Sequence, residues 1–199
     1  MKTSSLILAV FLAALVAGAG GVAAWKAGLF GGSEHAQPMV GGPFQMTDQN
    51  GKRVDESLLK GKWTAVFFGY TYCPEACPTT LTTLARAQDQ LGPKARDLQV
   101  VFVSVDPERD TPAQLKTYLS SQSFPKGTIG LTGSTADVAR TAKAYKVFYQ
   151  KSGSGPNYEM DHSTALYLMD PKGRFDRVIA YGLPPEEVAR QIGDAMRNP

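Results

Sequence analysis

The chain has 199 residues, of which 43% are hydrophobic and 20% charged, a composition typical of a globular protein with a packed core. Its formal net charge is +3, and the basic residues are spread along the chain without a Lys/Arg-rich run, which argues against nucleic acid as a partner. The two cysteines lie four residues apart, so a scaffold held together by many disulfides is also excluded.

An apolar run without a charged residue extends from Leu6 to Trp25. About 20 such residues are enough to cross the hydrocarbon core of a bilayer as a helix, and a cleaved signal peptide usually has a shorter apolar region. We therefore interpret residues 1–25 as a retained signal-anchor, although the small residues 16–21 also offer a cleavage site. The glycine-rich residues 26–42 are expected to form a flexible tether, and residues 43–199 a domain on the extracytoplasmic side.

The predicted domain begins with a β-hairpin. Residues 44–47 alternate like a short strand and precede the turn signal at residues 48–51. A βαβ unit follows, because residues 63–70 and 98–105 are apolar, β-prone runs typical of buried parallel strands. The helix expected between them ends at Gly92-Pro93. Its buried face is predicted to carry Leu81, Leu84, Gln88 and Leu91.

The second half of the domain continues with helices and strands. Thr111 or Asp110 can cap a helix that has Pro112 in its first turn. A short strand, a helix with a capping box, a turn-rich loop, a hairpin and a last helix are expected at residues 128–131, 134–145, 153–157, 163–181 and from 184 onward. This order predicts an α/β domain with a thioredoxin-like fold, elaborated by an N-terminal β-hairpin and insertions and preceded by one transmembrane helix.

Cys73 and Cys77 lie at the junction between the first buried strand and its helix. Backbone N–H groups and the helix dipole lower the pKa of a thiol there, which favours the thiolate needed of a nucleophile or metal ligand. If both cysteines were helical, they would share one face, with Cα atoms about 6 Å apart. That separation allows either a shared metal ion or a disulfide. The alternative, two small core residues, leaves their position at this junction unexplained.

The donor set favours copper over zinc. Zinc usually requires four ligands, whereas two thiolates at low coordination number suit Cu(I). Thioredoxin-type reductases have two residues between their cysteines, and this motif has three. His162 is the only histidine after the tether and offers a third, nitrogen ligand. Without the cysteines it would be interpreted as a buried, hydrogen-bonded histidine.

Two aspartates are candidates for contacts around the ligands. Asp161 precedes His162 and can accept a hydrogen bond near the site, or simply cap the entry into a strand. Asp106 ends the second central strand, at the sheet edge where the cysteine loop is expected. It can therefore reach the site, but it can equally form the turn before Pro107.

Three motifs together resemble the Sco (SenC) family of copper chaperones. They are the sequences at residues 72–78 (YCPEACP), 104–112 (SVDPERDTP) and 161–163 (DHS). The resemblance extends from about residue 40 to the C-terminus and is specific because the motifs occur in this order. Glu75 and Ala76, between the cysteines, depart from the expected pattern but are not ligands.

The resemblance implies that Cys73, Cys77 and His162 bind Cu(I) or Cu(II), with Asp161 and Asp106 nearby. It further implies a partner, the cytochrome c oxidase subunit that carries the CuA site, and a role in copper delivery, in reduction of the partner's cysteines, or in both. Other copper chaperones or thiol reductants are further expected partners. A bacterial inner membrane, with the domain in the periplasm, is favoured over a mitochondrial one because no Arg-rich transit peptide is present.

Two main hypotheses thus remain open from the sequence, and a copper or redox sensor would look the same in the sequence. The first is a metallochaperone that depends on His162. The second is a thiol-disulfide oxidoreductase that needs the cysteines but not the histidine, with Cys73 as the attacking residue because the first cysteine of such pairs is usually the more exposed. A peroxidase ranks last, because no peroxiredoxin-like cysteine motif is present.

Overall fold

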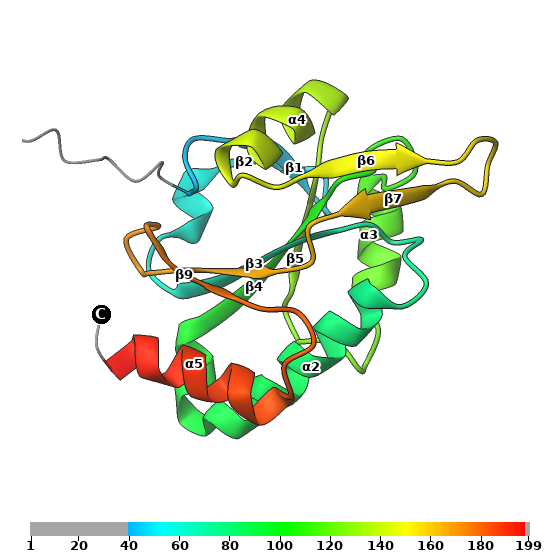
Figure 1. Ribbon diagram of the computed structural model, residues 1–199. Helices are drawn as coiled ribbons and strands as arrows, with labels where there is room; N and C mark the ends of the chain where they lie inside the picture. Colours follow the sequence, from blue (N-terminus) through cyan, green and yellow to red (C-terminus); the bar gives the residue numbers. More distant parts are fainter. Residues whose placement is uncertain (1–39, 198–199) are drawn as a thin grey trace, which may run out of the picture. The chain divides into compact units, whose positions relative to one another are not determined.

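The computed structural model describes residues 40–197, which form an α/β domain (Figure 1). The predicted anchor, residues 1–25, and residues 26–39 of the predicted tether lie outside the described residues. Among the helices of residues 40–197, none is both long and apolar enough to cross a membrane.

Nine strands make up two sheets in the described part of the chain. Their bounds are β1 Gln45–Asp48, β2 Arg53–Asp55, β3 Trp63–Gly69, β4 Leu98–Ser104, β5 Ile129–Thr132, β6 Tyr149–Ser152, β7 Glu159–His162, β8 Leu166–Met169 and β9 Phe175–Ile179. Seven of them form the main sheet in the order β2-β1-β5-β4-β3-β8-β9, and β6 pairs with β7 in a separate sheet.

The main sheet is mixed, and its centre is parallel. β3 pairs with β4 and β4 with β5 in parallel, whereas β8 runs antiparallel to β3. The predicted parallel βαβ unit and the hairpins β1–β2 and β8–β9 are therefore confirmed. All seven residues of β3 are buried, as a continuous apolar run predicts for a central strand covered on both faces.

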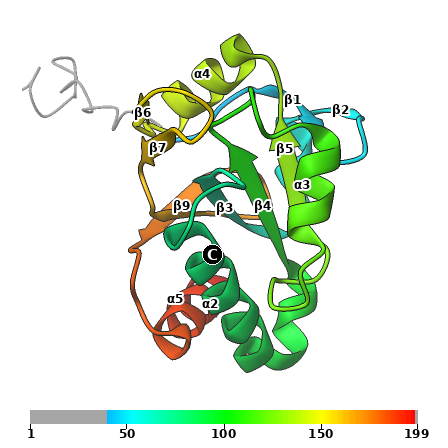
Figure 2. The same cartoon turned by 90° about the vertical axis from the view of Figure 1, so that its right-hand side faces the viewer.

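The helices cover both faces of the main sheet. Their bounds are α2 Ala76–Leu91, α3 Pro112–Leu119, α4 Thr135–Ala144 and α5 Pro185–Arg197, with 3₁₀ helices at Glu56–Leu59 and Gly92–Asp97. α2 and α5 lie side by side on one face, below the sheet in Figure 1, and α4 lies on the other (Figures 1 and 2). Thr111 caps α3, and Ser134 with Asp137 forms the predicted capping box of α4.

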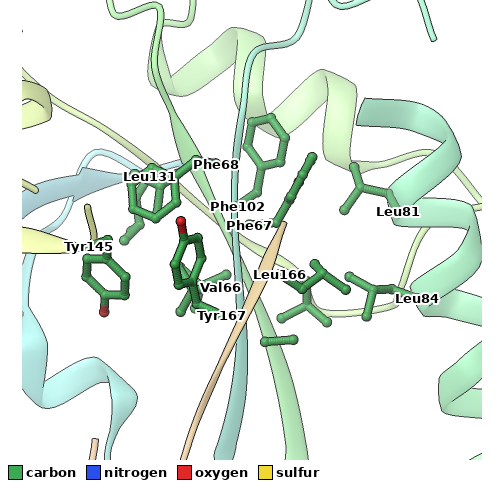
Figure 3. Packing of buried hydrophobic residues seen from close by; sticks show 14 of the residues in the cluster. Val66, Phe67, Phe68, Leu81, Leu84, Phe102, Leu131, Tyr145, Leu166 and Tyr167 are labelled. Atoms are coloured by element: carbon green, nitrogen blue, oxygen red, sulfur yellow. The ribbon is translucent and has the colours of Figure 1, made fainter. Parts of the chain in front are cut away.

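The core follows the alternation of side chains along β3 (Figure 3). Phe67 faces α2 and packs against Phe102, with ring centroids 5.9 Å apart. Phe68 faces the other way and packs against Tyr145, directly after α4, at 5.3 Å. On α2, the predicted Leu81 is fully buried, but the helix also buries small residues that the apolar pattern did not identify. These are Cys77, Thr80 and Ala87.

One prediction about the strands is wrong. The expected strand at residues 163–169 begins only at Leu166, and His162 ends a different strand, β7. β7 pairs with β6 around the predicted turn-rich loop, and this hairpin was not anticipated. The sequence of β6 gives little strand signal, because Gln150, Lys151 and Ser152 are all exposed and the strand has no buried apolar face.

Candidate metal centre

The loop from β3 to α2 places Cys73 just outside the helix. The N–H of Cys73 donates to the Tyr70 carbonyl (3.2 Å), and α2 begins only at Ala76. The two cysteines therefore do not share a helical face. The N–H of Cys77, in the first turn of α2, instead points at the Cys73 sulfur at 3.4 Å, so Cys73 still benefits from the helix N-terminus.

Cys77 packs directly against the backbone of β3. Its side chain is fully buried, whereas Cys73 is half-buried, and both thiols are free. A Cβ atom built on Gly69 would lie only 2.6 Å from the Cys77 sulfur. Residue 69 must therefore be glycine for the sulfur to occupy this position. The sequence analysis missed this residue, although a glycine inside an apolar strand is a known signal of close approach.

His162 brings its ring to the cysteines from the end of β7. Its Nε2 lies 3.7 Å from the Cys77 sulfur, and its Nδ1 lies 2.9 Å from the Ser163 carbonyl oxygen. Because a carbonyl can only accept, Nδ1 carries the proton and Nε2 presents its lone pair to the cysteines. The imidazole ring makes edge-on contacts with Tyr70 and Phe67, at centroid distances of 5.8 and 6.3 Å, which restrict its rotation.

The three predicted residues therefore converge. The ligand atoms of Cys73, Cys77 and His162 all lie within 4.8 Å of one another, and residues 40–197 contain no other group of three such side chains close enough to hold one ion. Two sulfurs and one imidazole nitrogen form a soft, three-donor set, which suits copper in low coordination and leaves zinc one ligand short.

The two thiols differ in acidity. The hydrogen bond from the Cys77 thiol, supported by hydrogen bonds from the backbone of Cys77 and Glu75, lowers the pKa of Cys73. The same bond, together with burial and the negative charge on Cys73, raises the pKa of Cys77. In the metal-free protein, the half-buried Cys73 is therefore the more acidic thiol and the buried Cys77 the less acidic one.

Known proteins are similar to this chain in sequence. A family model described as SCO1/SenC matches residues 32–197. The chain belongs to the SCO1/SenC family.

Two similar relatives come from a plant and a bacterium. Protein SCO1 homolog 1, mitochondrial, of Arabidopsis thaliana is 42% identical over 146 residues, which are 72% of this chain and 43% of the Arabidopsis protein. Protein SenC of Rhodobacter capsulatus is 39% identical over 172 residues, which are 84% of this chain and 77% of SenC. The chain thus spans less than half the length of the first relative and about three quarters of the second.

Solved structures of Sco proteins share the fold. Arabidopsis thaliana ScoI with copper bound has a TM-score of 0.76 at 38% identity, over 80% of this chain and 99% of that one. Copper-bound Bradyrhizobium japonicum ScoI has a TM-score of 0.71 at 45% identity, over 78% and 98%. BsSco, described as a cytochrome c oxidase assembly protein with a disulfide switch, has 0.63 at 25%, over 79% and 92%. These similarities confirm the predicted thioredoxin-like α/β fold.

The two aspartates expected near the ligands do not lie in the ligand group. Asp106 is buried, and its oxygens accept hydrogen bonds from the Tyr158 hydroxyl (2.6 Å) and Arg109 Nε (2.5 Å). Asp161 is exposed on β7, so it faces away from the side that carries His162. The hydrogen bond from the histidine ring goes to the Ser163 carbonyl instead.

A third aspartate supports the cysteine loop. Asp110 is fully buried and accepts hydrogen bonds from Thr71 N–H (3.1 Å), the Thr71 hydroxyl (2.6 Å) and the Ser104 hydroxyl (2.7 Å). Burial raises its pKa, although these bonds oppose the shift. The sequence analysis considered Asp110 only as a helix cap, because Thr71, the partner on the cysteine loop, is 39 residues away in the sequence and gives no local signal.

Proposed function

We propose that this protein binds one copper ion through Cys73, Cys77 and His162 and delivers it during assembly of the CuA centre of cytochrome c oxidase. The observation that carries the proposal is the convergence of two sulfurs and a correctly oriented imidazole nitrogen within 4.8 Å. Family membership and the copper-bound ScoI structures support the choice of metal, and BsSco supports the choice of partner.

A site with only three donors suits a copper ion that must be transferred to a partner. A chaperone has to release its ion by ligand exchange, in which an incoming thiolate bonds to copper as one of the site ligands departs. The oxidation state of the copper does not change in such a step. Cys73 and His162 are half-buried and open to a partner, whereas Cys77 is fully buried. Exchange therefore begins at Cys73 or His162 and ends at Cys77.

The difference between the two thiols also favours a second activity, reduction of a disulfide in a partner. The Cys73 thiolate attacks one partner sulfur, forming a mixed disulfide and releasing the other sulfur as a thiolate, which is then protonated. Cys77 loses its proton and attacks Cys73, so that the partner leaves as a dithiol and the pair becomes a disulfide. The lowered pKa of Cys73 beside a buried Cys77 is the pattern of an attacking and a resolving thiol.

The proposed location is the outer side of a bacterial inner membrane, with residues 1–25 as the anchor. The charge-free apolar run from Leu6 to Trp25 supports this proposal. A tether at residues 26–42 would let the domain reach a membrane-bound oxidase subunit. Other copper chaperones or thiol reductants would then load the site with copper or keep its cysteines reduced.

Copper titration of the reduced full-length chain tests the proposal, with wild type, His162→Ala and Cys73→Ser compared. Wild type should bind one copper per chain, and His162→Ala should bind at least about tenfold more weakly, because a ligand is lost. The matched control is His35→Ala, which removes the chain's other histidine and should bind like wild type. If wild type binds no copper, or His162→Ala binds as tightly, the proposed site is wrong.

A disulfide-reduction assay on the same variants separates the two activities. A disulfide-bonded peptide serves as substrate. Reduction that persists in His162→Ala but is lost in Cys73→Ser would show that the thiol chemistry is independent of copper. Reduction that is lost in neither variant would exclude Cys73 as the attacking thiol.

A further inference from the structure

The third proposed ligand comes from a hairpin that is built separately from the main sheet. β6 and β7 pair only with each other, so no backbone ladder fixes the hairpin to the strand that leads to the cysteines. Tyr158, Met160 and His162 alternate along the second half of the hairpin and are buried or half-buried, whereas Glu159 and Asp161 are exposed. The side of the hairpin that carries His162 must therefore be held by side-chain contacts.

Arg109 lies between this hairpin and the cysteine loop. Its guanidinium carbon is 3.6 Å from the ring centroid of Tyr158, which directly precedes β7. On the other side it is 4.7 Å from the ring of Tyr72, the residue before Cys73, and 5.7 Å from that of Tyr70. One planar cation thus contacts aromatic rings from the hairpin that carries His162 and from the loop that carries Cys73.

Hydrogen bonds fix this arginine in place. Its Nε donates to Asp106 (2.5 Å), the same carboxylate that accepts the Tyr158 hydroxyl (2.6 Å). Nη1 donates to the Pro156 carbonyl (3.4 Å) near the tip of the hairpin. Nη2 is buried and makes no hydrogen bond within residues 40–197, so the aromatic faces hold that end of the group. An exposed pair, Lys151 with Glu108, adds a weaker contact (2.9 Å).

We propose that Arg109, fixed by Asp106 and stacked on Tyr158, is a positioning residue that holds the β6–β7 hairpin against the cysteine loop and so places His162 for copper. This inference rests on the proposed function and adds to it a control of copper affinity by residues that do not touch the ion. Asp106, expected at the site from the sequence, acts through Arg109 and Tyr158.

Physical reasons favour arginine and tyrosine in these roles. A guanidinium is planar and can stack on two rings while its edge donates to a carboxylate, whereas an ammonium group cannot do both. Arg109→Lys should therefore keep the charge but loosen the hairpin. Tyr158→Phe keeps the ring and removes only the hydroxyl that bonds Asp106, so it perturbs the same connection with little risk to folding.

The experiment measures the Cu(I) dissociation constant of the reduced full-length chain against a competing chelator. We expect Arg109→Lys and Tyr158→Phe each to weaken binding about tenfold, as for other residues that orient a metal ligand. In a His162→Ala background, the same substitutions should change binding by less than about twofold, the usual limit of additivity. In the Cu(II) form, the nitrogen coupling of His162 in the EPR spectrum should weaken in both variants.

Arg174→Lys is the matched control. Arg174 also donates through Nε to an aspartate, Asp170 (2.7 Å). It lies at the opposite end of β3, because the register pairs Met169 with Thr64 and Leu166 with Phe67. This substitution should leave copper affinity unchanged.

The possible results separate the two proposals. Wild type without bound copper would refute the proposed function and this inference with it. Wild type that binds copper through His162, but with the same affinity in Arg109→Lys and Tyr158→Phe, would refute the inference alone. A loss of equal size with and without His162 would also refute it, because the arginine would then act on the cysteines or on the fold.

Discussion

Gly69→Ala tests how Cys77 is held against β3. The new Cβ would lie 2.6 Å from the Cys77 sulfur, about 1 Å closer than the optimum for non-bonded atoms. The new Cβ cannot relieve this clash by moving aside, because Phe102 Cε2 and Phe67 Cε1 would lie only 3.0 and 3.1 Å from it. Overpacking of this kind costs about 1–3 kcal/mol, and we expect Gly69→Ala to lower the free energy of unfolding by an amount in that range. The displaced sulfur should also weaken copper binding about tenfold, since ligand placement governs affinity.

Urea unfolding of the reduced, copper-free full-length chain measures the stability, in the wild-type and Cys77→Ala backgrounds. Without the sulfur, the added methyl group gains space, and the cost of Gly69→Ala should fall to about 1 kcal/mol or less. Gly193→Ala is the control. Its Cβ would meet Leu91 at an ordinary 3.5 Å inside α5, so helix propensity should make it neutral or stabilising. An equal cost of Gly69→Ala in both backgrounds would refute the reasoning.

Three further predictions concern the supports of the fold, each measured by urea unfolding. Asp110→Ala should lower the free energy of unfolding by about 3 kcal/mol, because buried donors of Thr71 and Ser104 lose their acceptor. Asp110→Asn should cost less, because it keeps one oxygen. Equal costs of the two substitutions would contradict this assignment. Ser134→Ala should cost about 1 kcal/mol through loss of the α4 capping box, and no loss would mean that the cap is dispensable. The hydrogen bond from Ser134 lowers the pKa of Asp137 below 3.8 in the folded protein. Ionised Asp137 therefore stabilises the fold above that pH, and this stabilisation is lost as the pH falls through the lowered pKa. The stability difference between wild type and Asp137→Asn should therefore shrink as the pH falls below 3.8, and a difference independent of pH would exclude this linkage.

Much of the fold could be predicted because local patterns and tertiary structure agree. β3 and β4 are buried as continuous apolar runs predict, and the caps at Thr111 and Ser134 lie where short-range signals placed them. The cysteine pair was also locatable, because a strand-to-helix junction is visible in the sequence. That His162 approaches the pair was predicted from its chemistry, and the structure brings it there.

The remaining features depend on contacts that the sequence does not encode locally. The β6–β7 hairpin has few apolar positions, because its strands are largely exposed and Tyr158 and Met160 supply most of its buried surface. Arg109 lies in the motif at residues 104–112, but the sequence gave no indication of its role, since its partners Tyr72 and Tyr158 come from other segments. Gly69 was visible in the sequence, but its requirement follows only once Cys77 packs on it.

The tip of the β6–β7 hairpin is a suitable site for inserting a reporter into this protein. Residues 153–157 are exposed, and Gly153 and Gly155 adopt positive φ angles of 83° and 74° in an open turn. Loop tips of this kind tolerate insertions, because few buried groups depend on them. A short peptide tag or a fluorescent reporter inserted after Gly153, away from the Pro156 carbonyl that accepts from Arg109, would therefore sit on the segment that carries His162 and leave the seven-stranded sheet untouched. Such a reporter would respond to changes in the surroundings of the hairpin that carries His162.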